Sequence, residues 1–267
     1  MKLRPIAGVV MRQFYLLRGS PVRLFPMVTW VAIDVVLWGF ITRYLNSVSG
    51  SGVNFVPTLL GAVLLWDFCT RVMQGVSTAF LEDVWSRNFL NLFSSPLSIS
   101  EYITGLVVTS VITSCVGLVT MLLLATGVFH LQFFSLGLPL AAFLLLLFVF
   151  GITLGILGSA IVLRFGPASE WLLWPLPALL SPFAAVFYPL ATLPPWMQAI
   201  ARALPPAYVF EGMRGLLGGR AFPAGMLLAG SAVAVLELLV AAYFYGRIYR
   251  RAVRTGLLAR YSAEGAA

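Results

Sequence analysis

Apolar stretches of about 20 residues recur along the whole chain, and they constrain its fold more than any other feature of the sequence. Six windows of this kind are recognised, at residues 24–46, 54–80, 101–129, 132–163, 169–191 and 223–247. A stretch of this length is what an α-helix needs to cross a bilayer. The composition agrees, since 60% of the residues are hydrophobic, 10% are charged and the mean hydropathy is +0.97. The sequence therefore predicts an all-α membrane protein with six transmembrane helices in one domain, residues 1–267.

Basic residues gather at the two ends of the chain. Five of them precede the first window, namely Lys2, Arg4, Arg12, Arg18 and Arg23, and a second group lies between residues 247 and 260. Six spans would place both termini on the same side, and an excess of basic residues favours the cytoplasmic side. We therefore expect a multi-pass protein of the bacterial cytoplasmic (inner) membrane. Both termini, including the basic tail 248–267, would then lie in the cytoplasm.

The first 22 residues have the pattern of an amphipathic helix. One face carries Ile6, Val9 and Phe14, and the arginines lie around the other face. This periodicity fits a disordered basic tail less well than a helix. The pattern predicts an interfacial helix over residues 1–22, with its apolar face in lipid and its arginines among the anionic headgroups of membrane lipids.

Several classes of function are disfavoured by what the sequence lacks. Lys2 is the only lysine, so the chain cannot supply the internal lysine of a nucleotide-binding loop and is not expected to be an enzyme that hydrolyses ATP. The only histidine, His130, is not accompanied by clustered ligands, so no metal site is expected. The basic residues are explained by topology and lipid headgroups, so nucleic acid is not expected as a partner.

The fifth window and the residues after it are interrupted by prolines. Each proline removes a backbone donor, and broken backbone at membrane depth survives only where it is buried in protein or lines a water-filled cavity. Pro-Pro pairs at residues 194–195 and 205–206 then flank a short amphipathic stretch, and Glu211 and Arg214 follow at helical spacing. We therefore expect short outer helices over residues 192–220 rather than a simple loop.

The longest connection on the predicted cytoplasmic side covers residues 81–100. It carries an acidic start, aromatic residues and a proline stop: Glu82, Asp83, Trp85, Arg87, Asn88, Phe89 and Pro96. A short amphipathic helix of this kind is suited to dock into a partner protein, and the alternative is a solvated connector. Docking is favoured because exposed aromatic side chains are costly without a partner.

Three charged residues lie at comparable depth inside the first two predicted spans. Asp34 lies near the middle of the first span, and Asp67 and Arg71 lie one turn apart in the second. We expect Arg71 to be neutralised by Asp67, by Asp34 or by both, because ionised groups in a membrane are costly without partners. The cluster either locks the first two spans together or takes a direct part in binding substrate or protons.

These features together resemble the membrane (permease) subunit of type-2 ABC exporters. The resemblance covers nearly the whole chain, and its most specific part is the run from Leu193-Pro194-Pro195-Trp196 through Tyr208 to Glu211 and Arg214. It implies that residues 81–100 form the coupling helix that contacts a separate ABC ATPase. Residues 192–220 would form re-entrant helices that gate the exit of the pathway. Many relatives carry Gly-Thr where this chain has Arg87-Asn88, which suggests an ATPase matched to this chain.

The resemblance also implies an assembly and a pathway. Two copies of the chain would form a homodimer with two ATPase subunits, which bind ATP and Mg; no cofactor is expected in this chain. The pathway would lie between the second and fifth spans, with Phe183, Phe187 and Tyr188 as its lining. The expected function is ATP-driven export of an amphipathic, lipid-like, glycan or drug substrate. The alternatives are an ion-gradient-driven secondary transporter, a membrane-embedded enzyme and a non-transporting assembly subunit that works with an ABC ATPase.

Overall fold

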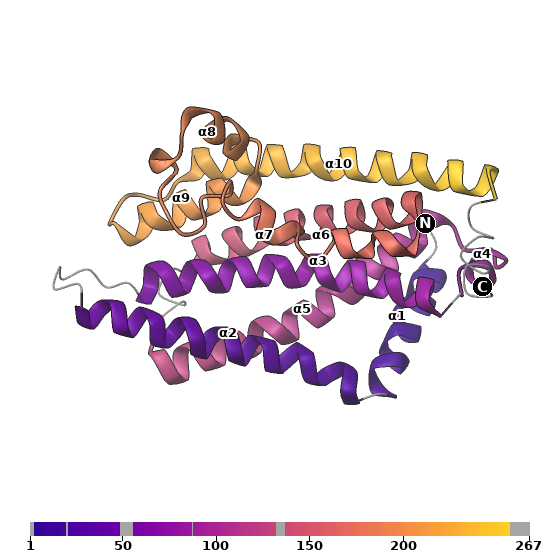
Figure 1. The fold of residues 1–267 in the computed structure, drawn as a ribbon, viewed down its shortest axis with the longest axis horizontal. Helices are drawn as coiled ribbons and strands as arrows, with labels where there is room; N and C mark the ends of the chain where they lie inside the picture. Colours follow the sequence, from indigo (N-terminus) through magenta and orange to yellow (C-terminus); the bar gives the residue numbers. More distant parts are fainter. Residues whose placement is uncertain (1–2, 20, 49–55, 87, 132–136, 257–267) are drawn as a thin grey trace.

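The computed structural model describes residues 3–19, 21–48, 56–86, 88–131 and 137–256, and no strand occurs among them. Five long helices run side by side (Figure 1): α2 (Pro21–Val48), α3 (Gly61–Trp85), α5 (Ile99–Phe129), α6 (Leu138–Phe165) and α10 (Ala224–Arg254). Each is long and apolar enough to cross a membrane, α3 together with the preceding turn η1 (Val56–Leu60). The prediction of an all-α, multi-pass protein is confirmed.

The helices α3 and α6 form the centre of the bundle. They pack on each other, α5 packs on α3, α10 packs on α6, and α2 lies against α5 on the outside. The buried side chains that fill these contacts are apolar, among them Val72, Phe80, Phe143 and Phe150. The outer helix α2 instead exposes large apolar side chains such as Trp30 and Phe40, as expected for a helix that faces lipid.

The close contact between α3 and α6 depends on glycines. A Cβ atom added at Gly151 would lie 2.7 Å from the carbonyl oxygen of Cys69, and one at Gly155 would lie 2.7 Å from Cβ of Val76. Small residues four apart allow two helix backbones to approach closely. In this chain Gly151 and Gly155 therefore allow α6 to pack closely on α3 of the same subunit.

This contact predicts a matched pair of substitutions. Gly151→Ala forces the α3 backbone away and is expected to lower the free energy of unfolding by about 1–3 kcal/mol. Gly246→Ala on α10 is the control, because a Cβ there meets nothing within 4 Å and alanine has the higher helix propensity. Unfolding in mixed detergent, followed by tryptophan fluorescence, compares the two; equal midpoints would contradict the tight α3–α6 contact.

The prediction of a spanning helix over residues 169–191, the fifth window, is not confirmed. In the described part of the chain, this stretch consists of the short turn η3 (Pro167–Leu172), the short helix α7 (Leu176–Leu180), bends, and the turn η4 (Leu190–Thr192). The physical reason is the spacing of the prolines at 175, 177, 182 and 189, which remove donors and clash with the preceding turn. We call residues 167–192 the broken segment.

Short helices lie at both ends of the bundle. Figure 1 shows α1 (Leu3–Arg18) and α4 (Phe89–Phe93) near one end, with the C-terminal end of α10, and α8 (Pro195–Arg202) and α9 (Pro205–Leu217) at the other. The predicted boundary of the second span was too early, because α3 continues to Trp85. Glu82 and Asp83 therefore belong to the last turn of α3, and among the described residues between α3 and α5 only Phe89–Phe93 (α4) are helical.

Candidate functional site

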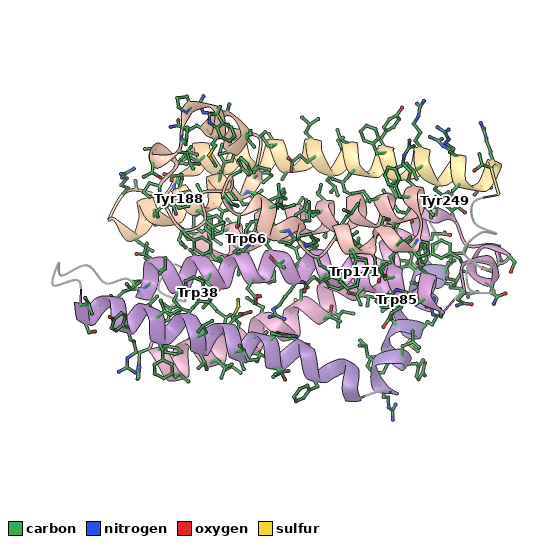
Figure 2. The ribbon with its side chains drawn as sticks, viewed as in Figure 1. Trp38, Trp66, Trp85, Trp171, Tyr188 and Tyr249 are labelled. Carbon is green, nitrogen blue, oxygen red and sulfur yellow. The ribbon has the colours of Figure 1, made fainter. Side chains whose placement is uncertain are left out.

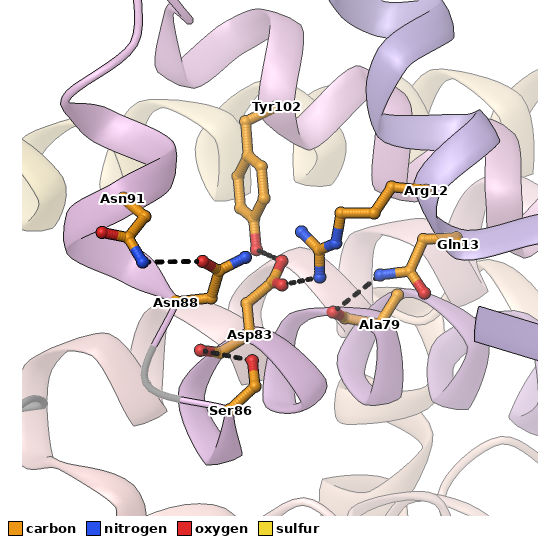
Figure 3. A network of polar contacts seen from close by, with 8 residues as sticks. All are labelled: Arg12, Gln13, Ala79, Asp83, Ser86, Asn88, Asn91 and Tyr102. Atoms are coloured by element: carbon orange, nitrogen blue, oxygen red, sulfur yellow. Dashed lines mark hydrogen bonds and ion pairs between the residues drawn. The ribbon is translucent and has the colours of Figure 1, made fainter. Parts of the chain in front are cut away.

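A buried polar network joins α1 to the ends of α3 and α5 (Figure 3). The Asp83 carboxylate is fully buried and forms an ion pair with the Arg12 guanidinium. The Tyr102 hydroxyl donates to the second carboxylate oxygen at 2.6 Å, and the Gln13 side-chain amide donates to the Ala79 carbonyl at 3.3 Å. We call these five residues the Arg12 network.

Local sequence places each member of this network. Ser98 begins α5 with a capping box, in which its hydroxyl accepts from the Glu101 backbone and the Glu101 carboxylate accepts from the Ser98 backbone. This fixes Tyr102 in the first turn of α5. Gly105 lies one turn later, where an added Cβ would lie 2.7 Å from the Val9 side chain. A small residue at this position lets α1 approach α5, so that Arg12 reaches Asp83.

Burial explains why Asp83 needs both partners. A carboxylate without water is costly, and charge-assisted hydrogen bonds to both of its oxygens compensate for that loss. The prediction that Arg12 lies among lipid headgroups is therefore wrong, because it faces the protein. On the same helix, Phe14 and Tyr15 follow it and have exposed side chains. Asp83 also contributes nothing to an exposed docking surface, so any part that it plays in coupling is through Arg12 and Tyr102.

The other residues of the predicted coupling connection divide into buried and exposed groups. Phe89 is buried against Phe80 and Tyr102, with ring centroids 5.3 and 6.1 Å apart, while Glu82 and Asn88 are half-buried. Trp85 is 52% exposed and Pro96 is also exposed. Arg87 lies outside the described residues. Trp85 and Pro96 are therefore the exposed members among the predicted coupling residues that the structure describes.

Trp85 also connects α3 to the broken segment. Its indole nitrogen donates to a carboxylate oxygen of Glu170 in η3 at 2.7 Å. Figure 2 shows Trp85 and Trp171 near each other at the end of the bundle where α4 lies. A displacement of the end of α3 can therefore act directly on the first turn of the broken segment.

The second cluster of polar contacts lies at the opposite end, where α9 meets the broken segment. The Arg214 guanidinium donates to the carbonyls of Ala185 at 2.7 Å and Val186 at 3.2 Å, and it pairs with Glu211 at 2.8 Å. Glu211 in turn accepts from the backbone N–H of Leu190 at 2.6 Å. We call these five residues the outer latch.

The outer latch supplies hydrogen-bond partners to backbone groups of the broken segment, which a continuous helix would satisfy by itself. Ala185 has a φ of 52°, a left-handed conformation that is costly for alanine and needs support from its surroundings. Backbone groups of an irregular segment must be satisfied within the protein when water is scarce. The predicted pairing of Glu211 with Arg214 is therefore present, and it extends beyond a local pair.

The remaining residues of the predicted gate shape the outer helices. Pro194 and Pro195 begin α8, and Trp196 is exposed, with its ring 6.1 Å from that of Phe183. The Tyr208 hydroxyl donates to the Arg202 carbonyl at 2.7 Å, which ties α9 to the end of α8. Prolines at the start of both helices cost no backbone hydrogen bond, because those N–H groups have no partner inside the helix.

The predicted pathway residues lie in the broken segment. Phe187 is 40% exposed and stacks on Trp38 of α2, with ring centroids 5.8 Å apart and an interplanar angle of 12°. Phe183 and Tyr188 are half-buried, and the Tyr188 hydroxyl donates to the Pro182 carbonyl at 2.6 Å. The intramembrane pair is present too: Arg71 donates to Asp67 at 2.6 and 3.2 Å.

Sequence reasoning missed Arg12, Gln13 and Tyr102. Arg12 and Asp83 are 71 residues apart, and no local pattern in the sequence pairs them. The arginines of α1 were explained by lipid headgroups alone, so this pairing was not predicted.

The comparisons with known proteins agree with this architecture. A search of curated proteins found no match. The family model for ABC-2 type transporters matches residues 9–217, from α1 through both polar clusters to the end of α9. This match covers most of the chain, and the matched family consists of the membrane components of ABC transporters. The chain is thus a multi-pass permease subunit that belongs to the ABC-2 type transporter family.

Proposed function

We propose that this chain is the permease subunit of an ATP-driven exporter that moves an amphipathic, lipid-like, glycan or drug substrate out across the bacterial cytoplasmic membrane. In this proposal two copies of the chain form a homodimer in the lipid bilayer. Two ABC ATPase subunits bind at the end of the bundle that carries α1 and α4, and they hold the ATP and Mg. Both termini lie on that cytoplasmic side.

The observation that carries the proposal is the continuous connection from the coupling residues to the broken segment. Trp85 is exposed at the end of α3 and is hydrogen-bonded to Glu170 at the start of that segment. Asp83, two residues earlier, is bonded to α1 and α5. A push on this end would therefore move α1, α3 and the start of the broken segment together. This is what a mechanical coupling between an ATPase and a pathway needs.

The outer latch supports the second half of the proposal. The segment that would line the pathway is held at its outer end by side chains of α9 rather than by its own helical bonds. A segment held by a few exchangeable hydrogen bonds can change its arrangement more readily than a continuous helix. We propose that α8, α9 and the outer latch gate the exit.

Purification and reconstitution test the proposed function. The chain is extracted in mild detergent from its native membrane with all bound subunits, and the expected result is a co-purifying ABC ATPase that turns over ATP. Reconstituted vesicles should then export fluorescent amphiphiles only when ATP is supplied on the ATPase side. Transport by the chain alone, driven by a proton or sodium gradient, would overturn the proposal.

Two substitutions of Trp85 separate docking from coupling. Trp85→Ala removes an exposed aromatic side chain at the proposed contact and is expected to weaken ATPase binding about tenfold. Trp85→Phe keeps an apolar ring but loses the bond to Glu170, so it should bind the ATPase more tightly than Trp85→Ala while coupling ATP turnover to transport less well. Trp30→Ala, an exposed tryptophan of α2, is the control. Equal ATPase recovery with Trp85→Ala and Trp30→Ala would contradict this contact.

A further inference from the structure

In the charged cluster of Asp34, Asp67 and Arg71, one carboxylate has no hydrogen bond to the described residues. Asp67 and Arg71 lie on consecutive turns of α3, and their two hydrogen bonds occupy both carboxylate oxygens of Asp67. Asp34 on α2 lies near enough to both residues to interact with their charges. It forms no hydrogen bond or ion pair with any residue that the structure describes. Two carboxylates thus lie near one guanidinium, whose hydrogen bonds go to Asp67.

The surroundings of Asp34 leave it accessible. The helix α2 packs mainly on α5 and η1 and hardly on α3, so α2 does not seal the side of α3 that carries Asp67 and Arg71. Asp34 itself is half-buried within the span Val28–Val48. An ionised side chain at this depth is costly without a counter-charge, which makes a cation the chemically fitting partner.

An unsatisfied hydroxyl lies at the same level on α5. Ser114 is buried, and its hydroxyl has no hydrogen-bond partner among the described residues. One turn before it, Ser110 donates to the Val72 carbonyl at 2.8 Å; one turn after it, a Cβ at Gly117 would lie 3.3 Å from Cδ of Arg71. Ser114 therefore faces α3 beside Arg71. Its hydroxyl can therefore donate to a further polar group.

A stacked pair of aromatic rings begins one helical turn after Asp34. Trp38 lies one turn after Asp34 on α2, and its ring stacks on that of Phe187 in the broken segment. Aromatic faces next to a carboxylate are a recurrent arrangement for binding organic cations, because the ring face attracts positive charge and the ring also covers apolar groups. These two residues connect the charged cluster with the predicted pathway.

We propose that Asp34 binds the positive charge of an amphipathic organic cation, with Trp38 and Phe187 covering its apolar part. This inference rests on the proposed export function and narrows its substrate class. The Asp67–Arg71 pair would hold the site in place, since Arg71 is already engaged and does not compete for Asp34 through a hydrogen bond. An anionic amphiphile of the same size would meet a surplus negative charge and bind less well.

Binding of two probes of nearly equal size and opposite charge tests this proposal. The complex of the full chain with its ATPase is equilibrated with tetraphenylphosphonium or tetraphenylborate, and binding is measured by dialysis. The unaltered complex should bind the cation and not the anion. Asp34→Asn should weaken binding of the cation about tenfold, the size expected when one charged partner is lost. Asp34→Glu should change it less than about threefold, because the charge remains.

Control variants keep the test decisive. Glu237→Gln removes an acid from α10, which packs on α6 and α9, and should leave cation binding unchanged. Trp38→Leu should weaken cation binding, whereas Trp30→Leu should not, and this pair gives an answer even if Asp34→Asn fails to fold. Equal binding of the cation by Asp34→Asn and by the unaltered complex would overturn the inference. It would indicate that the Asp34 carboxylate is neutralised by a proton instead.

The two levels of the proposal fail in different ways. If the unaltered complex has no ATPase or no ATP turnover, the proposed export function fails. If it turns over ATP and exports an amphiphile but binds both probes alike, only the cation site fails. An effect of Glu237→Gln equal to that of Asp34→Asn would show a general loss of intramembrane charge, and it would also contradict a site at Asp34.

Discussion

Arg12→Ala is expected to lower the free energy of unfolding by about 3 kcal/mol, the lower end of the range for removing one partner of a buried ion pair. The reason is the environment of Asp83, whose carboxylate is fully buried and would keep only the hydrogen bond from Tyr102. The substitution should also loosen the packing of α1, because Arg12 holds α1 to the end of α3. Detergent unfolding followed by tryptophan fluorescence measures the first effect, and protease sensitivity within α1 measures the second.

Three further variants separate the contribution of the Arg12–Asp83 ion pair from the contributions of single residues. Arg4→Ala, an exposed arginine of the same helix, should leave the unfolding midpoint unchanged. Tyr102→Phe should cost about 1 kcal/mol, since Arg12 still neutralises the carboxylate. The double change Arg12→Met with Asp83→Leu should recover most of the stability, because apolar residues of similar size can replace a buried pair. Equal midpoints for Arg12→Ala and Arg4→Ala would contradict the Arg12 network.

Most of the fold could be predicted because bilayer thickness and hydropathy are properties of single segments. Five of the six predicted windows correspond to long helices in the structure, and the Pro-Pro pairs lie where α8 and α9 begin. The fifth window, residues 169–191, does not form a spanning helix, because hydropathy takes no account of the backbone donors that prolines remove. Residues 169–191 are apolar enough to cross, but their prolines prevent a continuous helix.

The candidate site was less predictable, because it depends on contacts between distant segments. Glu211 and Arg214 were placed together by local spacing, and so were Asp67 and Arg71. By contrast, Arg12 and Asp83 are 71 residues apart, and no local pattern tells an arginine among lipid headgroups from one that faces the protein. The bonds from Arg214 to the carbonyls of the broken segment could not be foreseen either, since that segment was expected to be a helix.

Arg214→Ala should affect the outer end of the molecule as strongly as Arg12→Ala affects the other. It leaves the carbonyls of Ala185 and Val186 without their donor, and it leaves Glu211 without its counter-charge. Each buried polar group that loses its partner costs about 1–3 kcal/mol, so we expect a loss of about 3 kcal/mol in the free energy of unfolding. The broken segment should also become more sensitive to protease, because Ala185 holds a strained backbone conformation.

The matched variants show whether geometry or charge holds the outer latch. Arg214→Lys keeps the charge but cannot reach both carbonyls with a planar fork, so it should recover less than half of the stability lost in Arg214→Ala. Arg202→Ala on α8 is the control, because that side chain is exposed. In the reconstituted exporter, Arg214→Ala should abolish ATP-dependent transport while ATP turnover continues, since the latch lies at the end of the bundle opposite to the proposed ATPase contact. If Arg214→Lys is as stable as the unaltered protein, charge alone suffices, and the two carbonyl bonds do not hold the broken segment.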